Sequence, residues 1–164
     1  MDKKQVIRYW EERFGIPPAA FVPYDFYFST RTAYIARKSS HNRVISDLKT
    51  DFIGLPFLRQ VTKFLKPTTV AAQRFGFLAQ KNVISLDKDS LLSLCQQGEI
   101  AWNSGQETTS SGFVILKIVW PDSPLLSTGA YLGVSLFLEP NRLLCRLPKS
   151  MTKGLCHSLS REDK

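Results

Sequence analysis

The chain has 164 residues, a formal net charge of +8 and a pI near 9.6. This length allows one domain or two small ones that share an interface, and 43% hydrophobic with 22% charged residues excludes an intrinsically disordered chain. The strong basic balance favours an anionic partner, with nucleic acid first, an acidic membrane surface second and an acidic protein third.

Targeting signals and cysteine spacing indicate the compartment. The N-terminal stretch MDKKQVIRYWEERFG lacks the apolar segment of a signal peptide, and no apolar run approaches the roughly 18–20 residues of a spanning helix. Three cysteines, Cys95, Cys145 and Cys156, are far apart and form no CxxC pair. This pattern argues for a reducing compartment and against both a disulfide framework and a zinc site. We therefore expect a soluble, cytoplasmic protein.

The first predicted element is an amphipathic helix over residues 3–14. Gly15 is a suitable C-terminal stop, and the two prolines that follow predict a short helical turn over residues 17–21. The predicted inward face, at helical spacing, consists of Val6, Ile7, Trp10 and Phe14.

A two-stranded hairpin is predicted over residues 24–38. The aromatic side chains at 24, 26 and 28 alternate with their neighbours, and a short polar turn separates them from Ala33 and Ile35. Alternation with period two is typical of a half-buried strand. Residues 44–61 predict further short extended pieces, with Pro56 at an edge or a bend.

A second helix is predicted to begin at Pro67, because the first helical position does not need an N–H. Gly76 interrupts or ends this helix. Its predicted inward face consists of Val70, Ala71, Phe75, Leu78 and Ala79.

The second half of the chain predicts a strand, a helix and then more strands. NVISLD is the strand, and Asp87 is the expected N-cap of a helix that Gly98 terminates. A polar loop at residues 104–112 precedes three predicted strands, in GFVILKIVWP, YLGVSLFLEP and RLLCRLPKS. The predicted fold class is therefore α+β, with a domain boundary near residues 79–82.

The sequence contains little that would support an enzyme. Neither of the common phosphate-binding glycine loops is present. His41 and His157 are the only histidines, and the side chains of His157 and its neighbour Cys156 would point apart in a strand. Cys95 and Cys145 are expected to be small buried hydrophobes. We expect a non-catalytic protein with no cofactor and no metal.

Two stretches, residues 57–81 and 140–161, carry positive charge and no acid. Any one of these cations could simply be the solvent side of an amphipathic element. Together, in so basic a chain, they predict a surface that binds a polyanion. The predicted contacts are Arg59, Lys63, Lys66, Arg74 and Lys81 in the first stretch and Arg142, Arg146, Lys149 and Lys153 in the second.

The order of segments in the second half carries a resemblance. NVISLDKDSLLSLCQQGEIAW, followed by GFVILKIVWP and YLGVSLFLEPNRLLCRLPK, resembles a PUA or PUA-like domain. RYWEERFGIPPAAFVPYDFYF and GLPFLRQVTKFLKPTTVAAQRFGFLAQKN are similar to the region ahead of that module in NOL1/NOP2/Sun-family RNA cytosine methyltransferases and in Nip7-like ribosome-biogenesis proteins.

The resemblance implies a small N-terminal α/β domain over residues 1–79, a PUA-like β pseudobarrel over 80–157 and a polar tail over 158–164. In such modules the glycine that ends the helix and a late strand line the RNA surface, which implies Gly98 and Gly133 as further RNA contacts. Glu99 departs from that pattern, because it puts a negative charge beside the glycine. The family's catalytic half is not matched, since no cysteine follows a proline in the context of its nucleophile.

The function expected from these observations is recognition of structured tRNA or rRNA through a basic surface, accessory to RNA modification or ribosome assembly. A methyltransferase or a ribosome-assembly factor is a possible partner. Two other functions stay open: a protein-interaction module that docks an acidic partner, and a small RNA-modifying enzyme whose site the sequence does not reveal.

Overall fold

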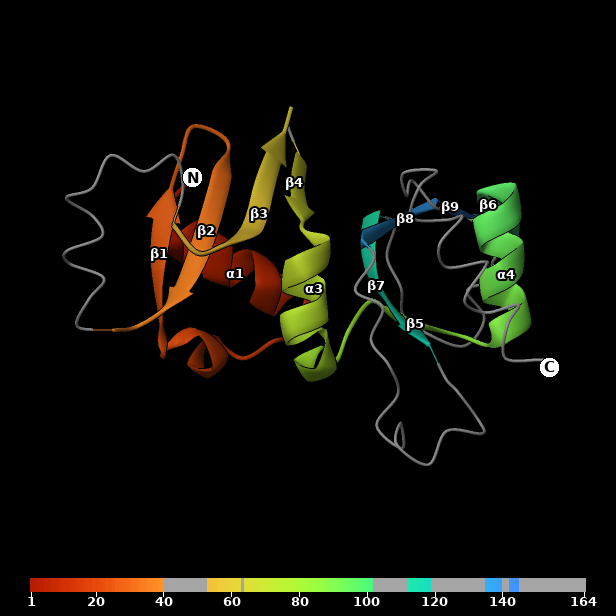
Figure 1. Ribbon diagram of the computed structural model, residues 1–164, viewed down its shortest axis with the longest axis horizontal. Coiled ribbons are helices and arrows are strands. Elements are labelled where there is room, and N and C mark those ends of the chain that lie inside the picture. The colour runs from red at the N-terminus through yellow and green to blue at the C-terminus, as the bar shows by residue number, and fades with distance from the viewer. Residues whose placement is uncertain (40–52, 63, 102–111, 119–134, 140–141, 145–164) are drawn as a thin grey trace.

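A computed structural model describes residues 1–39, 53–62, 64–101, 112–118, 135–139 and 142–144. The helices and strands form two groups, each built around one sheet (Figure 1). The first group comprises α1 (Lys3–Phe14), η1 (Pro18–Phe21), β1 (Tyr24–Phe28), β2 (Thr32–Arg37), β3 (Leu55–Val61), β4 (Phe64–Pro67), α3 (Thr69–Phe75) and η2 (Gly76–Leu78). The second comprises β5 (Val83–Leu86), α4 (Lys88–Gln97), β6 (Glu99–Ala101), β7 (Gly112–Ile118), β8 (Ser135–Glu139) and β9 (Arg142–Leu144).

The first helix, α1, has both ends capped within its own sequence. The Asp2 side chain accepts from the Gln5 N–H at 2.8 Å, and the Gln5 side chain accepts from the Asp2 N–H at 3.1 Å, which forms a capping box. Gly15 ends the helix in the left-handed conformation, with φ of 67°, as predicted. Val6, Trp10 and Phe14 are fully buried, so the predicted inward face is confirmed for these three residues.

The first sheet is antiparallel with the strand order β1-β2-β3-β4. The predicted hairpin is confirmed, since Phe26 lies opposite Ile35 and Phe28 opposite Ala33. In Figure 1 the four strands stand side by side in front of α1. Buried residues of α1, β2, β3 and α3 belong to a single core, so both helices cover one face, here called the inner face.

Phe57 lies at the centre of this core. Its ring is fully buried and stacks on Trp10 with the ring centroids 4.8 Å apart. It also makes edge-to-face contacts with Phe21, Phe26 and Phe75. Such aromatic pairs add roughly 0.5–1.5 kcal/mol each beyond the area that they bury. The strand β3 is thereby held by elements from most of the first half of the chain.

A β-bulge allows two successive residues of β3 to point inward. Ala33 pairs with Leu58 but Tyr34 pairs with Pro56, so Phe57 is the extra residue. Phe57 and Leu58 are both fully buried. Pro56 therefore lies in an interior strand at an irregularity, where a missing N–H is tolerated.

The second sheet has the order β5-β7-β8-β9-β6, with β5 parallel to β7 and the other pairs antiparallel. Val114, Ile115 and Leu116 of β7 are buried in succession, as in a strand that is covered on both faces. Asp87 caps α4 by accepting from the Ser90 N–H at 2.7 Å, and Gly98 ends that helix with φ of 78°. Both predictions for this helix are confirmed.

Two elements differ from the sequence-based expectation. Pro67 ends the strand β4 and does not open a helix; Thr68 is the N-cap of α3. The short strand β6, which pairs with β9, was not predicted.

The α+β class is confirmed, but β5 and β6 end the second sheet without pairing to each other, so no closed barrel is present among the described strands. None of the described helices is long and apolar enough to cross a membrane.

The two sheets are joined by polar contacts around Asn82. Its Nδ2 donates to the Arg13 main-chain oxygen at 2.5 Å, and its main-chain oxygen accepts from the Ile115 N–H at 2.9 Å. Arg13 in turn donates from Nε to the Phe113 main-chain oxygen at 2.8 Å. The main-chain N–H groups of Gln80 and Lys81 both donate to the Phe14 oxygen. The segment between the sheets is therefore bonded to the end of α1.

Candidate nucleic-acid interface

The outward face of the first sheet, on the side away from α1, is defined by strand register. Tyr27 lies opposite Tyr34, and Arg59 lies opposite both Thr32 on β2 and Lys66 on β4. Val61 lies opposite Phe64 one step further along the β3–β4 hairpin. Residues opposite each other in a ladder share a face, and those two positions apart on a strand do as well.

The bulge decides that Arg59 faces outward. Regular alternation from the buried Phe57 would put Arg59 and Val61 on the inner face. Because both Phe57 and Leu58 point inward, the alternation after them is reversed, and Arg59 and Val61 emerge on the outward face. The packing of the core therefore sets the position of this cation.

The bulge is supported by the N-cap of α3. The Thr68 hydroxyl donates to the Pro56 main-chain oxygen and accepts from the Ala71 N–H at 3.1 Å. The Thr68 N–H also donates to the Phe57 oxygen at 3.3 Å. Backbone groups that the bulge takes out of the regular ladder thus find partners in the turn that starts the helix.

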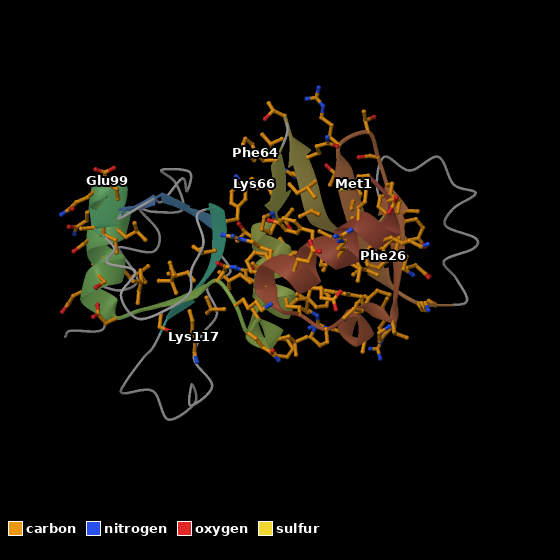
Figure 2. The ribbon with its side chains drawn as sticks, turned by 180° about the vertical axis from the view of Figure 1, so that it is seen from behind. Met1, Phe26, Phe64, Lys66, Glu99 and Lys117 are labelled. Atoms are coloured by element: carbon orange, nitrogen blue, oxygen red, sulfur yellow. The ribbon has the colours of Figure 1, made fainter. Side chains whose placement is uncertain are left out.

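Four residues at the free end of the β3–β4 hairpin form a surface that we call the hairpin quartet: Arg59, Val61, Phe64 and Lys66. Val61 is 49% exposed and Phe64 65% exposed, although both are large apolar residues. Figure 2 shows Phe64 and Lys66 on the same edge strand, seen from the α1 side. The quartet combines an exposed aromatic ring with two cations.

Neither cation of the hairpin quartet forms an ion pair with any residue that the structure describes. Like charges placed directly opposite each other in a ladder repel, so the Arg59–Lys66 pair is unfavourable for the sheet itself. The Lys66 ammonium lies 6.0 Å from the centroid of the Phe113 ring, a cation–π contact that leaves its charge uncompensated. Asp25, the one acid on the described outward face, lies on the far edge strand β1. A bound anion would relieve the repulsion.

The turn of this hairpin is strained. Thr62, which follows β3, has φ of 54°, a conformation that β-branched residues rarely adopt. Hairpin loops favour Asn and Gly at positions with positive φ. Strained backbone of this kind is concentrated at binding sites, so the turn is consistent with a functional role for the hairpin.

The chain matches no protein-family model, no curated protein and no solved structure. The resemblance to PUA-like proteins stays a prediction from the sequence.

The structure brings together only two of the predicted contacts that it describes. Arg59 and Lys66 are neighbours, whereas Arg74 lies on α3, which covers the inner face, and Lys81 lies in the segment between the sheets. Gly98 has a structural reason for being glycine, since it ends α4 in the left-handed conformation and donates its N–H to Leu94. Its role in binding stays a prediction.

The remaining predicted contacts cannot be placed as side chains. Arg142 lies in β9, with its backbone opposite Ala101 and Glu139, and its side chain is not described. The other residues named from the sequence lie outside the described residues: Lys63, Gly133, Arg146, Lys149, Lys153, His41, His157, Cys145 and Cys156.

Phe64 and Val61 were not predicted from the sequence as part of a site. Both sit in an apolar, basic stretch where an aromatic residue is normally part of the core. The signal that was available is their spacing: Phe64 is two positions from Lys66, and Val61 is two positions from Arg59. This spacing becomes informative only once the pairing of β3 with β4 is known, and neither Gly nor Asn marks a turn between residues 61 and 64 in the sequence.

Proposed function

We propose that this protein binds RNA, and that the outward face of the first sheet supplies part of the contact surface. The observation that carries the proposal is the direct opposition of Arg59 and Lys66 beside an exposed aromatic ring. Cations that can reach successive phosphates supply most of the affinity of such surfaces, and flat side chains receive bases.

The finer parts of the proposal come from the sequence. The RNA is structured tRNA or rRNA, the protein is a non-catalytic accessory to RNA modification or ribosome assembly, and it acts in the cytoplasm. The second sheet belongs to a PUA-like pseudobarrel, in line with the succession of β5, a helix ended by Gly98, and further strands. The basic residues of the C-terminal stretch extend the surface.

The test is a fluorescence-anisotropy titration against total tRNA and a pool of rRNA fragments, at low and near-physiological salt. The double variant Arg59→Gln with Lys66→Gln should weaken binding and reduce the slope of log K against log salt by up to roughly 0.7–0.9 for each phosphate that is no longer neutralised. The double variant Lys4→Gln with Arg74→Gln removes the same charge from the helices of the inner face and should leave the slope closer to that of the wild type. Equal effects of the two double variants would contradict a localised site.

One observation favours the alternative, a protein-interaction module with an acidic partner. Val61 and Phe64 present adjacent apolar side chains next to two cations, a combination that is also found at protein interfaces. This alternative predicts weak, unselective RNA binding and a saturable contact with an acidic protein. Negligible binding of RNA at both salt concentrations would place it first.

A further inference from the structure

The hairpin quartet has a chemical selectivity that a merely basic surface would lack. Phe64 is 65% exposed, and its neighbours on the outward face are Val61 across the ladder and Lys66 two positions along the strand. An aromatic face offers a nucleobase a stacking surface, whereas a phosphate gains nothing from it. The ring therefore adds a preference for nucleotides whose bases are accessible.

Bases within a duplex are not accessible in this way. In A-form RNA they are stacked on one another and paired, so a protein meets mostly phosphates and 2′-hydroxyls. Bases in loops, bulges and single strands can turn outward and stack on aromatic side chains. A surface with an aromatic ring beside two cations thus suits unpaired nucleotides better than a helix.

The geometry of the ladder places the stacking surface and the phosphate-binding cations at a spacing that one nucleotide can span. Neighbouring strands lie about 4.8 Å apart, and residues two positions apart on one strand are separated by roughly 6.8 Å. Arg59 and Lys66 therefore lie within one such step of the Val61–Phe64 pair. A base stacked on Phe64 would keep its own phosphate within reach of the long side chains of Arg59 and Lys66.

We propose that the hairpin quartet binds an unpaired nucleotide of RNA, with Phe64 as the stacking platform and with Arg59 and Lys66 as the phosphate contacts. This inference rests on the proposed function and specifies the part of the RNA that the first sheet receives. A structured RNA would satisfy it through a loop or a bulge, so it is compatible with recognition of tRNA or rRNA.

The chain offers a matched control for the aromatic ring. Phe77 is 58% exposed, similar to Phe64, but it lies in η2 and not on a sheet face beside two opposed cations. Substitution of either residue removes a comparable exposed ring. A general effect of surface hydrophobicity would appear in both variants.

The experiment compares a fluorescein-labelled single-stranded RNA of mixed sequence, about twelve nucleotides long, with the same strand annealed to its complement. Phe64→Ala should weaken binding of the single strand about five-fold or more, because the stacking of one base on an aromatic side chain raises the affinity by at least about that factor. Phe64→Trp should keep the affinity, and Phe64→Leu, which is apolar but has no aromatic face, should behave like alanine. Phe77→Ala should change the affinity for the single strand and for the duplex by less than two-fold. Phe64→Ala should leave the affinity for the duplex unchanged. Thermal unfolding of each variant confirms that it is folded.

The outcomes separate this inference from the proposed function. If Phe64→Ala binds the single strand as well as the wild type does, while the Arg59 and Lys66 double variant binds weakly, the protein binds RNA but the stacking inference is wrong. Retention of affinity by Phe64→Leu would also overturn it, because an apolar contact would then suffice. If the wild type binds no RNA at either salt concentration, the proposed function fails and this inference fails with it. A protein partner sensitive to Phe64→Ala, without any effect on RNA, would assign the hairpin quartet to protein docking.

Discussion

Arg13 on α1 donates a hydrogen bond from Nε to the main-chain oxygen of Phe113 on β7, at 2.8 Å, and so joins the helix of the first sheet to the second sheet. The guanidinium is half-buried, and burial lowers its pKa from the ordinary value while the nearby Tyr9 opposes that shift. A charged donor that is partly removed from water must keep its acceptor, because leaving either group unpaired is costly.

Arg13→Met tests this link. Methionine keeps much of the apolar stem but removes the hydrogen bond from Arg13 Nε to the Phe113 oxygen, so we expect a loss of about 1–3 kcal/mol in the free energy of unfolding. Arg8→Met, on the same helix, breaks an exposed pair with Glu12 and should have little effect. Urea unfolding followed by circular dichroism provides the measurement. Equal losses in the two variants would show that the Arg13 contact adds no stability.

Asn82 supports the same junction through its backbone as well as its side chain. It is 9% exposed, has φ of 52°, and donates from Nδ2 to Arg13. Asn82→Ala loses this hydrogen bond and also forces alanine into the left-handed region, at a combined cost of about 2–4 kcal/mol. Asn82→Gly also loses the hydrogen bond, but glycine adopts a positive φ without strain. Thermal unfolding should therefore show Asn82→Gly to be more stable than Asn82→Ala. If Asn82→Ala were the more stable of the two, the positive φ at this position would not contribute to the loss of stability.

Thr68 is predicted to stabilise both the bulge and α3. Thr68→Val keeps the shape but removes the hydroxyl that bonds the Pro56 oxygen and receives the Ala71 N–H, and we expect a loss of about 1–3 kcal/mol in urea unfolding. Thr68→Ser keeps both bonds and should retain most of the stability. If Thr68→Val is as stable as the wild type, the hydrogen bonds of the hydroxyl add no net stability.

Elements of the fold could be predicted where apolar residues repeat at a regular spacing within one segment of the chain. The face of α1 and the hairpin of β1 and β2 followed from spacings of 3.6 and 2 residues. Other features depended on partners distant in the sequence. The strand β6 is three residues long and forms only by pairing with β9. The sequence FLKP predicts the start of a helix, because proline suits the first helical position, but in the structure it is the strand β4.

The candidate site was predicted only in part, for a related reason. Charge identified Arg59 and Lys66, but their place on the outward face depends on the bulge at Phe57, which reverses the alternation that the sequence suggests. Bulges arise from core packing and leave no regular pattern in a strand. Phe64 was missed because exposure of an aromatic ring is a property of the folded sheet edge, which residue type alone does not indicate.

The pH dependence of stability should reveal the environment of Tyr9. Burial raises the pKa of its phenol well above the ordinary value near 10, and the charge of Arg13 opposes the shift. The folded state then binds the proton more tightly than the unfolded state does. Stability is therefore fully present below about pH 10 and decreases as the pH rises above it.

Tyr9→Phe removes this contribution, so its free energy of unfolding should decrease less steeply than that of the wild type between about pH 9 and pH 11. Urea unfolding at several pH values gives the two slopes. Tyr27→Phe, on the outward face of the sheet, controls for the general effect of removing a phenol. Identical slopes for the wild type and Tyr9→Phe would contradict a desolvated phenol at this position.

The opposition of Arg59 and Lys66 predicts that binding and stability change in opposite directions. Arg59→Gln removes one of two like charges that face each other across the ladder, so the melting temperature should stay the same or rise slightly. The same change removes a phosphate contact, so affinity for single-stranded RNA should fall and the log–log salt slope should decrease by roughly 0.7. Arg59→Lys keeps the charge and should keep both the repulsion and most of the salt slope. If Arg59→Gln lowers the melting temperature and the affinity together, Arg59 serves the fold, and its weakened binding would be explained by loss of structure.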